Sequence, residues 1–102
     1  MAEPTWVPPA CTLPTAEQPL RAAEFADLFA TSVRASTRPA PGRLELDLDP
    51  TPEVAATAAG LAARETACCS FFTFALTATA GRLELAITVG PEHTGVLDGL
   101  AP

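Results

Sequence analysis

Alternation of apolar and polar residues predicts the best-defined strands of this chain. In residues 43–49 a leucine stands at every second position and charged side chains fill most of the positions between, so one face should be buried and the other wet. The same alternation recurs in residues 83–89 and, with phenylalanines, in residues 72–76. Ala80-Gly81 stands between these two runs and predicts a hairpin.

Helical spacing and capping residues complete the predicted elements. Residues 15–18 have the form of a capping box before apolar residues at helical spacing, and Thr51 followed by Pro52 begins an Ala-rich helix. In chain order the prediction is a strand at 10–13, a helix at 16–31, strands at 32–38 and 43–49, a helix at 51–67, strands at 72–76 and 83–89, and a helix at 91–100.

A short segment of the chain occurs twice. Gly42-Arg43-Leu44-Glu45-Leu46 recurs as Gly81-Arg82-Leu83-Glu84-Leu85, and Pro52-Glu53 recurs in the same register as Pro91-Glu92. Either both hairpins need the same turn and alternation, or the chain holds an old internal duplication.

These elements predict an α+β fold in a single small domain. The first six match a ferredoxin-like split β-α-β unit, to which one strand and a C-terminal helix are appended. We place the domain at residues 10–102, after a flexible, proline-containing tail at residues 1–9. A chain of 102 residues with 48% hydrophobic residues can build such a core without metal or disulfide support.

The net charge and the hydropathy of the chain limit the classes of partner that we expect the protein to bind. The formal net charge is −6, with six arginines and no lysine, which disfavours binding to nucleic acid or to an anionic membrane surface. No apolar stretch reaches the roughly 20 residues that span a bilayer, and the start lacks the pattern of a signal peptide. We expect a cytoplasmic protein.

The three cysteines are the candidate site. Cys68 and Cys69 are adjacent, and on a helix adjacent side chains differ in direction by about 100°, so both cannot point straight into a core. In a split β-α-β unit the first strand ends at the rim where the fourth begins, which would bring Cys11 to the pair. Clustered thiolates favour soft ions such as Hg(II), Cd(II), As(III), Cu(I) or Zn(II).

Two other residues are candidates for the same rim. Glu65 precedes Cys68 by three residues, so on a continuing helix its carboxylate lies beside the thiols. The alternative is a solvated Glu65 paired with Arg64 or Arg21. His93 is predicted at this rim but farther out in the sheet, which makes it a weaker candidate.

Other functions of the thiols stay open at this point. Free cysteine is a small hydrophobe, so the thiols could serve packing alone, and nucleophilic or redox catalysis is the third interpretation. The sequence contains no C-x-x-C, H-E-x-x-H, G-x-S-x-G or glycine-rich phosphate motif, so no catalytic residue is assigned. We lean against an enzyme and expect no organic cofactor.

Two segments carry a resemblance to a protein family. Cys11-Thr12-Leu13-Pro14 and the segment from Glu65 to Phe74, E-T-A-C-C-S-F-F-T-F, resemble a family of small, uncharacterised bacterial proteins common in actinobacteria. The resemblance covers residues 10–100 and implies that Cys11, Glu65, Cys68 and Cys69 act as a set, although Ser70 replaces a proline found in many relatives. A second, shorter resemblance is to organomercurial lyase, which implies two thiols and a carboxylate acting on mercury.

The acidic composition yields a direct prediction about DNA. A gel-shift assay with the protein's own promoter region should show no retardation at physiological salt, because no basic surface is available to neutralise phosphates. Tight, salt-sensitive retardation would contradict this interpretation.

Overall fold

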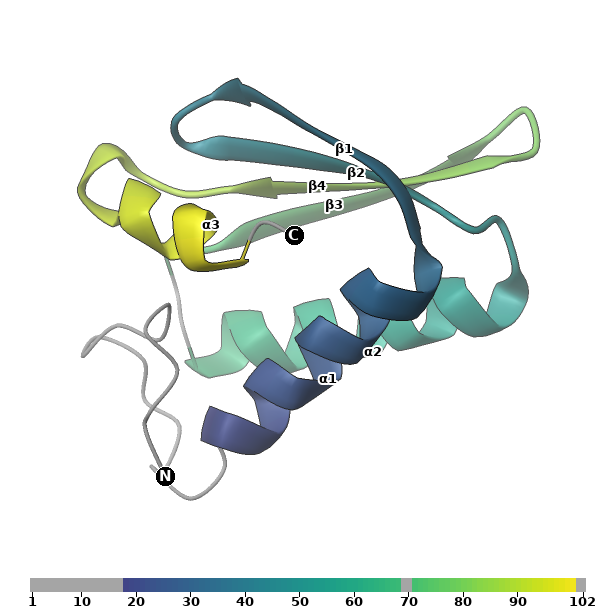
Figure 1. The fold of residues 1–102 in the computed structure, drawn as a ribbon, viewed down its shortest axis with the longest axis horizontal. Helices are drawn as coiled ribbons and strands as arrows, with labels where there is room; N and C mark the ends of the chain where they lie inside the picture. The colour runs from purple at the N-terminus through teal and green to yellow at the C-terminus, as the bar shows by residue number, and fades with distance from the viewer. Residues whose placement is uncertain (1–17, 69–70, 101–102) are drawn as a thin grey trace.

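The protein alternates helices and β-hairpins along the chain. The structure is a computed structural model that describes residues 18–68 and 71–100 (Figure 1). Its elements are α1 (Gln18–Ser32), β1 (Val33–Ala40), β2 (Arg43–Leu48), α2 (Pro52–Cys68), β3 (Thr73–Thr79), β4 (Arg82–Thr88), a 3-10 helix η1 (Pro91–His93) and α3 (Thr94–Leu100). The predicted α+β class is confirmed. The predicted tail at 1–9 and strand at 10–13 lie outside the described residues.

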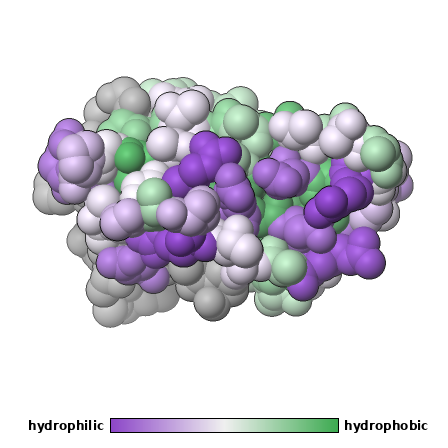
Figure 2. All heavy atoms as spheres, turned by 90° about the horizontal axis from the view of Figure 1, so that it is seen from above, coloured by the Kyte–Doolittle hydropathy of each residue, from purple (hydrophilic) through white to green (hydrophobic). Residues whose placement is uncertain are grey.

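The four strands form one antiparallel sheet that is covered on one face. Helices α1 and α2 lie together on that face (Figure 1), whereas hydrophilic side chains gather on the opposite face (Figure 2). Helix α3 is tied to the first hairpin, because Arg38 of β1 makes an ion pair with Asp98 at 2.9 Å and donates a hydrogen bond to the carbonyl of Thr94 at 3.2 Å. No helix within residues 18–68 and 71–100 is long and apolar enough to cross a membrane.

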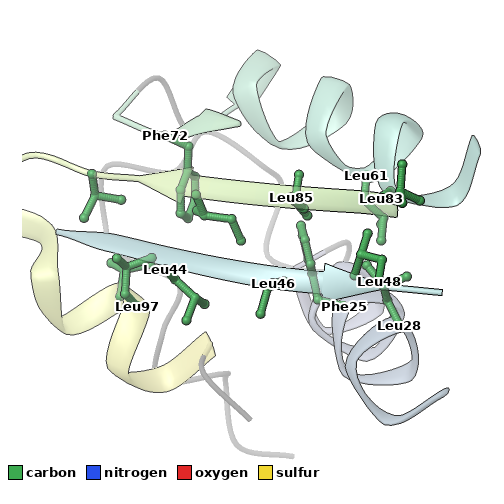
Figure 3. Close-up of a cluster of buried hydrophobic side chains, with 14 residues drawn as sticks. Phe25, Leu28, Leu44, Leu46, Leu48, Leu61, Phe72, Leu83, Leu85 and Leu97 are labelled. Atoms are coloured by element: carbon green, nitrogen blue, oxygen red, sulfur yellow. The ribbon is translucent and has the colours of Figure 1, made fainter. Parts of the chain in front are cut away.

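The leucines of the alternating strands form the core. In β2, every second residue is buried and the charged residues between them are half-buried, as the alternation predicted. Figure 3 shows these leucines with residues from all three helices around them. The labelled cluster comprises Phe25, Leu28, Leu44, Leu46, Leu48, Leu61, Phe72, Leu83, Leu85 and Leu97.

The strand order differs from the predicted arrangement in one respect. The order is β1-β2-β4-β3, so β4 lies in the interior of the sheet and pairs with β2 and β3 along its whole length. We expected this strand as an appendage. In a split β-α-β unit the place between β2 and β3 belongs to the predicted strand at 10–13. Here β4 occupies it, and an interior place suits this strand because most of its residues are apolar and buried.

The two halves of the chain are related by an approximate two-fold axis. Each half is a helix followed by a hairpin, and β2 of the first half pairs with β4 of the second. Leu46 lies opposite Leu85, which is its counterpart in the repeated segment. On either side of this pair, Leu44 lies opposite Ile87 and Leu48 opposite Leu83, so exchanging the halves reproduces the pairing. The repeated sequence thus corresponds to a repeated structure.

The hairpin turn at Ala80-Gly81 is confirmed and needs an unusual backbone. Both residues have positive φ, 50° at Ala80 and 74° at Gly81. Positive φ at both central residues is what a two-residue type I′ turn requires. Ala80 adopts this conformation at some cost, whereas glycine adopts it freely.

Replacing the leucine at the two-fold axis should destabilise the fold strongly. Leu46 is completely buried, so Leu46→Ala should lower the free energy of unfolding by about 2–5 kcal/mol, because it leaves a cavity. Ser36 lies opposite Leu46 on the adjacent strand β1 and is exposed. Ser36→Ala should change the free energy of unfolding by less than about 0.5 kcal/mol. Urea denaturation followed by circular dichroism measures both, and equal effects would contradict the assigned core.

Candidate metal centre

The candidate thiol site lies where α2 ends. Cys68 is the last residue of α2, and the described chain resumes at Phe71. Cys11, Cys69 and the side chain of Cys68 lie outside the described residues, so the predicted convergence of the three thiols stays a prediction. The sheet position beside β3 from which it was predicted is occupied by β4. The structure does show the residues that surround this end of α2.

Glu65, in the last turn of α2, is buried. Its exposed fraction is 1%, and among the described residues it is the only charged side chain that is fully buried. The interpretation of Glu65 as a solvated surface residue is therefore wrong. Its neighbour Arg64 points to the other flank of the helix and donates to Glu24 of α1 at 2.8 Å. Burying a carboxylate costs free energy unless the surroundings compensate it, and Glu65 does interact with other groups of the protein.

The spacing of residues along α2 explains why Glu65 is buried. Ala58 and Leu61 are buried and Val54 is half-buried, and Glu65 continues this series at steps of three and four residues. Such steps mark one face of a helix. The next position in the series is Cys68. The sequence contains this spacing, but α2 has alanines on every side, so the buried face could not be identified from the sequence.

An aromatic cluster follows the thiol segment directly. The rings of Phe71 and Phe72 lie 4.7 Å apart, and Phe72 lies 5.2 Å from Phe74. Phe72 is buried and Phe74 half-buried, as their alternation predicted, but Leu76 farther along β3 is 36% exposed. The core thus covers the start of β3 and leaves its far end open.

His93 lies closer to this junction than the sequence indicated. Its ring stacks on Phe71 with centroids 4.2 Å apart and an interplanar angle of 22°. The reason is that β4 is the direct neighbour of β3, with Thr88 opposite Thr73, so the end of β4 meets the start of β3. The placement of His93 farther out in the sheet was wrong because it treated β4 as an appendage.

The electrostatics at the end of α2 favour a cation. The C-terminal end of a helix carries a partial negative charge, and the last turn of α2 holds no basic residue to offset it. The carboxylate of Glu65 lies in the same region. If Cys68 and Cys69 lost their protons, their thiolates would add negative charge at this end of the helix. A bound cation would offset that charge.

Within the described ranges, no three His, Cys, Asp or Glu side chains lie close enough together to hold a metal ion. A hollow of about 410 Å³ is lined by Pro52, Ala55, Ala78 and other residues at the first turn of α2. It lies at the opposite end of the helix from Cys68 and does not belong to the thiol site.

Comparisons with models of protein families, with curated proteins and with solved structures give no match for this chain.

Two adjacent residues of α2 provide a matched test of the buried carboxylate. Glu65→Ala should lower the free energy of unfolding by at least about 2 kcal/mol, because it removes buried atoms and the interactions that compensate the carboxylate. Arg64→Ala removes an exposed ion pair and should cost less than about 1 kcal/mol. Urea denaturation compares the two, and a Glu65→Ala variant as stable as Arg64→Ala would contradict the burial of Glu65.

Proposed function

We propose that this protein binds one soft, thiophilic metal ion at the C-terminal end of α2, through Cys68 and Cys69 with Cys11 as a third ligand. The observation that supports the proposal best is the buried carboxylate of Glu65, one helical turn before Cys68. In the cytoplasm such a protein would serve metal resistance, buffering or sensing. The ion would be Hg(II), Cd(II), Zn(II) or Cu(I), because thiolates bind soft ions most tightly.

The buried carboxylate fits this role better than it fits packing. Thiols lose their protons when they bind a metal, and a nearby carboxylate can accept one of them. A positive ion would also offset the negative charge of Glu65 and of the helix end. If the thiols served packing alone, a leucine or methionine at position 65 would satisfy the same core at lower cost.

The stack of Phe71 on His93 gives the site an apolar wall. Phe71 and His93 are both only partly exposed, and their rings stack with centroids 4.2 Å apart. We assign His93 a packing role beside the metal. His93→Ala should therefore lower stability and leave the affinity for Hg(II) nearly unchanged.

The same arrangement favours a second candidate function, of organomercurial-lyase type. In this reaction the carbon–mercury bond breaks, carbon takes a proton from the carboxyl group, and the mercury stays on the thiolates. A buried carboxyl group beside thiols is the proton donor that such a step needs. Incubation with an organomercurial and excess thiol would then release hydrocarbon. Glu65→Gln would abolish this release and keep Hg(II) affinity, whereas a binder alone releases none.

Native mass spectrometry of the reduced protein tests the binding proposal. Titration with Hg(II), Cd(II), Zn(II) and Cu(I) should yield one bound ion per chain for at least the softest of them. The double variant Cys68→Ser/Cys69→Ser should lose several kcal/mol of binding free energy in competition with a small dithiol, since each thiolate contributes a bond to the ion. Ser70→Ala, a change in the same segment that removes no thiol, is the control and should bind like the wild type.

Cys11→Ser separates a three-coordinate site from a two-coordinate one. A loss of affinity comparable to that of Cys68→Ser identifies the third ligand. Undiminished metal affinity in the double variant would contradict the proposal and leave the packing interpretation.

A further inference from the structure

Within residues 18–68 and 71–100, β1 and β3 form the two edges of the sheet, and these edges are built differently. The edge strand β1 carries Arg34, Arg38 and Pro39, and its pairing with β2 is interrupted by two register shifts. The other edge, β3, consists of seven residues without a charge or a proline, and its register with β4 is unbroken from Thr73 to Thr79. Charges, prolines and bulges are the devices that keep edge strands from pairing with other chains. Edge β1 has them and edge β3 lacks them.

The strand β3 itself carries no charge, and the charged residues nearest to it in the sheet are Arg82 and Glu84 of β4. Every residue of β3 except Phe74 is exposed, and Leu76 is the large hydrophobic residue that the described part of the chain leaves exposed. Below this strand, α2 presents a flank of small residues. These residues are Ala55, Ala59, Ala62 and Thr66. Ala55 and Ala78 line the same hollow, so the flank and the strand form one surface. In a chain with a net charge of −6, an edge strand and a helix flank without charged residues are suited to contact with another protein surface.

The sequence of β3 is complementary to itself. In an antiparallel pair of two β3 strands centred on Leu76, the two leucines face each other and each Phe74 lies opposite an Ala78. Ala75 then lies opposite Thr77, and Thr73 opposite Thr79. A large ring thus meets a small methyl group, no like charges meet, and the ends are threonine pairs, which stabilise antiparallel strands.

We propose that two copies of this chain pair through β3 and form a continuous eight-stranded sheet. The chain already uses this geometry internally, where β2 and β4 pair antiparallel about Leu46 and Leu85. A two-fold axis at Leu76 makes the interface isologous, so each copy contributes the same surface. The strand pair alone is smaller than the roughly 1,200 Å² of a stable interface, and the α2 flank supplies the additional contact area.

The dimer does not depend on the proposed metal site. In the proposed register the two Thr73 residues lie six strand positions apart, about 20 Å at the usual rise per residue. The two thiol segments, which precede Thr73, therefore lie at opposite ends of the interface. Each chain keeps its own site, and dimerisation persists in the Cys68→Ser/Cys69→Ser variant.

Sedimentation velocity on the full chain, with a reducing agent and a metal chelator present, tests the proposal. The wild type should sediment as a dimer, with twice the mass of a single 10.5 kDa chain. Leu76→Lys and Leu76→Glu should each sediment as monomers, because two like charges meet at the axis. An equimolar mixture of the two variants should restore the dimer, since opposite charges then face each other.

Position 36 offers a matched control. Ser36 lies opposite Leu46 in the first hairpin as Leu76 lies opposite Leu85 in the second, and it is exposed in the edge strand β1. Ser36→Lys should leave the dimer intact, and circular dichroism verifies that all variants are folded. A monomeric wild type at every concentration tested would overturn the proposal without any variant. A dimer that survives Leu76→Lys, or a mixture that stays monomeric, would overturn it as well.

Discussion

The antiparallel pairing of β2 with β4 holds the two halves of this protein together. It places Leu46 against Leu85 at the centre of the core, and it decides the order of all four strands. Because β2 and β4 occupy the interior, β1 and β3 become the two edges of the sheet. Because β4 is also the partner of β3, the chain leaving β4 returns to the point where β3 begins. The open edge and the surroundings of the thiol segment both follow from this one pairing.

The site at the end of α2 combines features that ordinary packing does not require. One flank of α2 makes an exposed ion pair with α1, between Arg64 and Glu24, and its other flank carries only small residues. Between these flanks lies the buried stripe that ends in Glu65. The buried side chain of Glu65 interacts with other groups of the protein, and it lies one helical turn before Cys68. This placement of a buried carboxyl group next to the cysteine pair in sequence is the basis of the metal-binding proposal.

The sequence predicted the parts of the fold that depend on local patterns. The leucine alternation in residues 43–49 and 83–89 and the turn at Ala80-Gly81 correspond to observed strands and an observed turn. Strand order was harder to predict, because alternation shows which face of a strand is buried but not which strand lies beside it. For this reason β4 was expected as a strand appended to the sheet rather than as one of its interior strands.

The candidate site could be predicted only in part for a similar reason. Glu65 was recognised beside the cysteines from its spacing, but its burial depends on which side of an Ala-rich helix faces the core. Alanines are compatible with either side, so only Val54, Ala58 and Leu61 mark the buried stripe. The contact of His93 with Phe71 follows from strand order and could not be predicted before that order was known.

The most direct test of the metal-binding account is an amide-resolved NMR titration of the reduced protein with Cd(II). The account predicts that the signals of residues 65–72 and 91–93 change together and saturate at one equivalent of Cd(II), while the turn at Ala80-Gly81, at the far end of the β3–β4 hairpin, stays unchanged. Asp47 and Glu84, which lie opposite each other on the polar face of the sheet, provide the internal comparison. Changes centred on these two carboxylates, with none at the end of α2, would contradict the account.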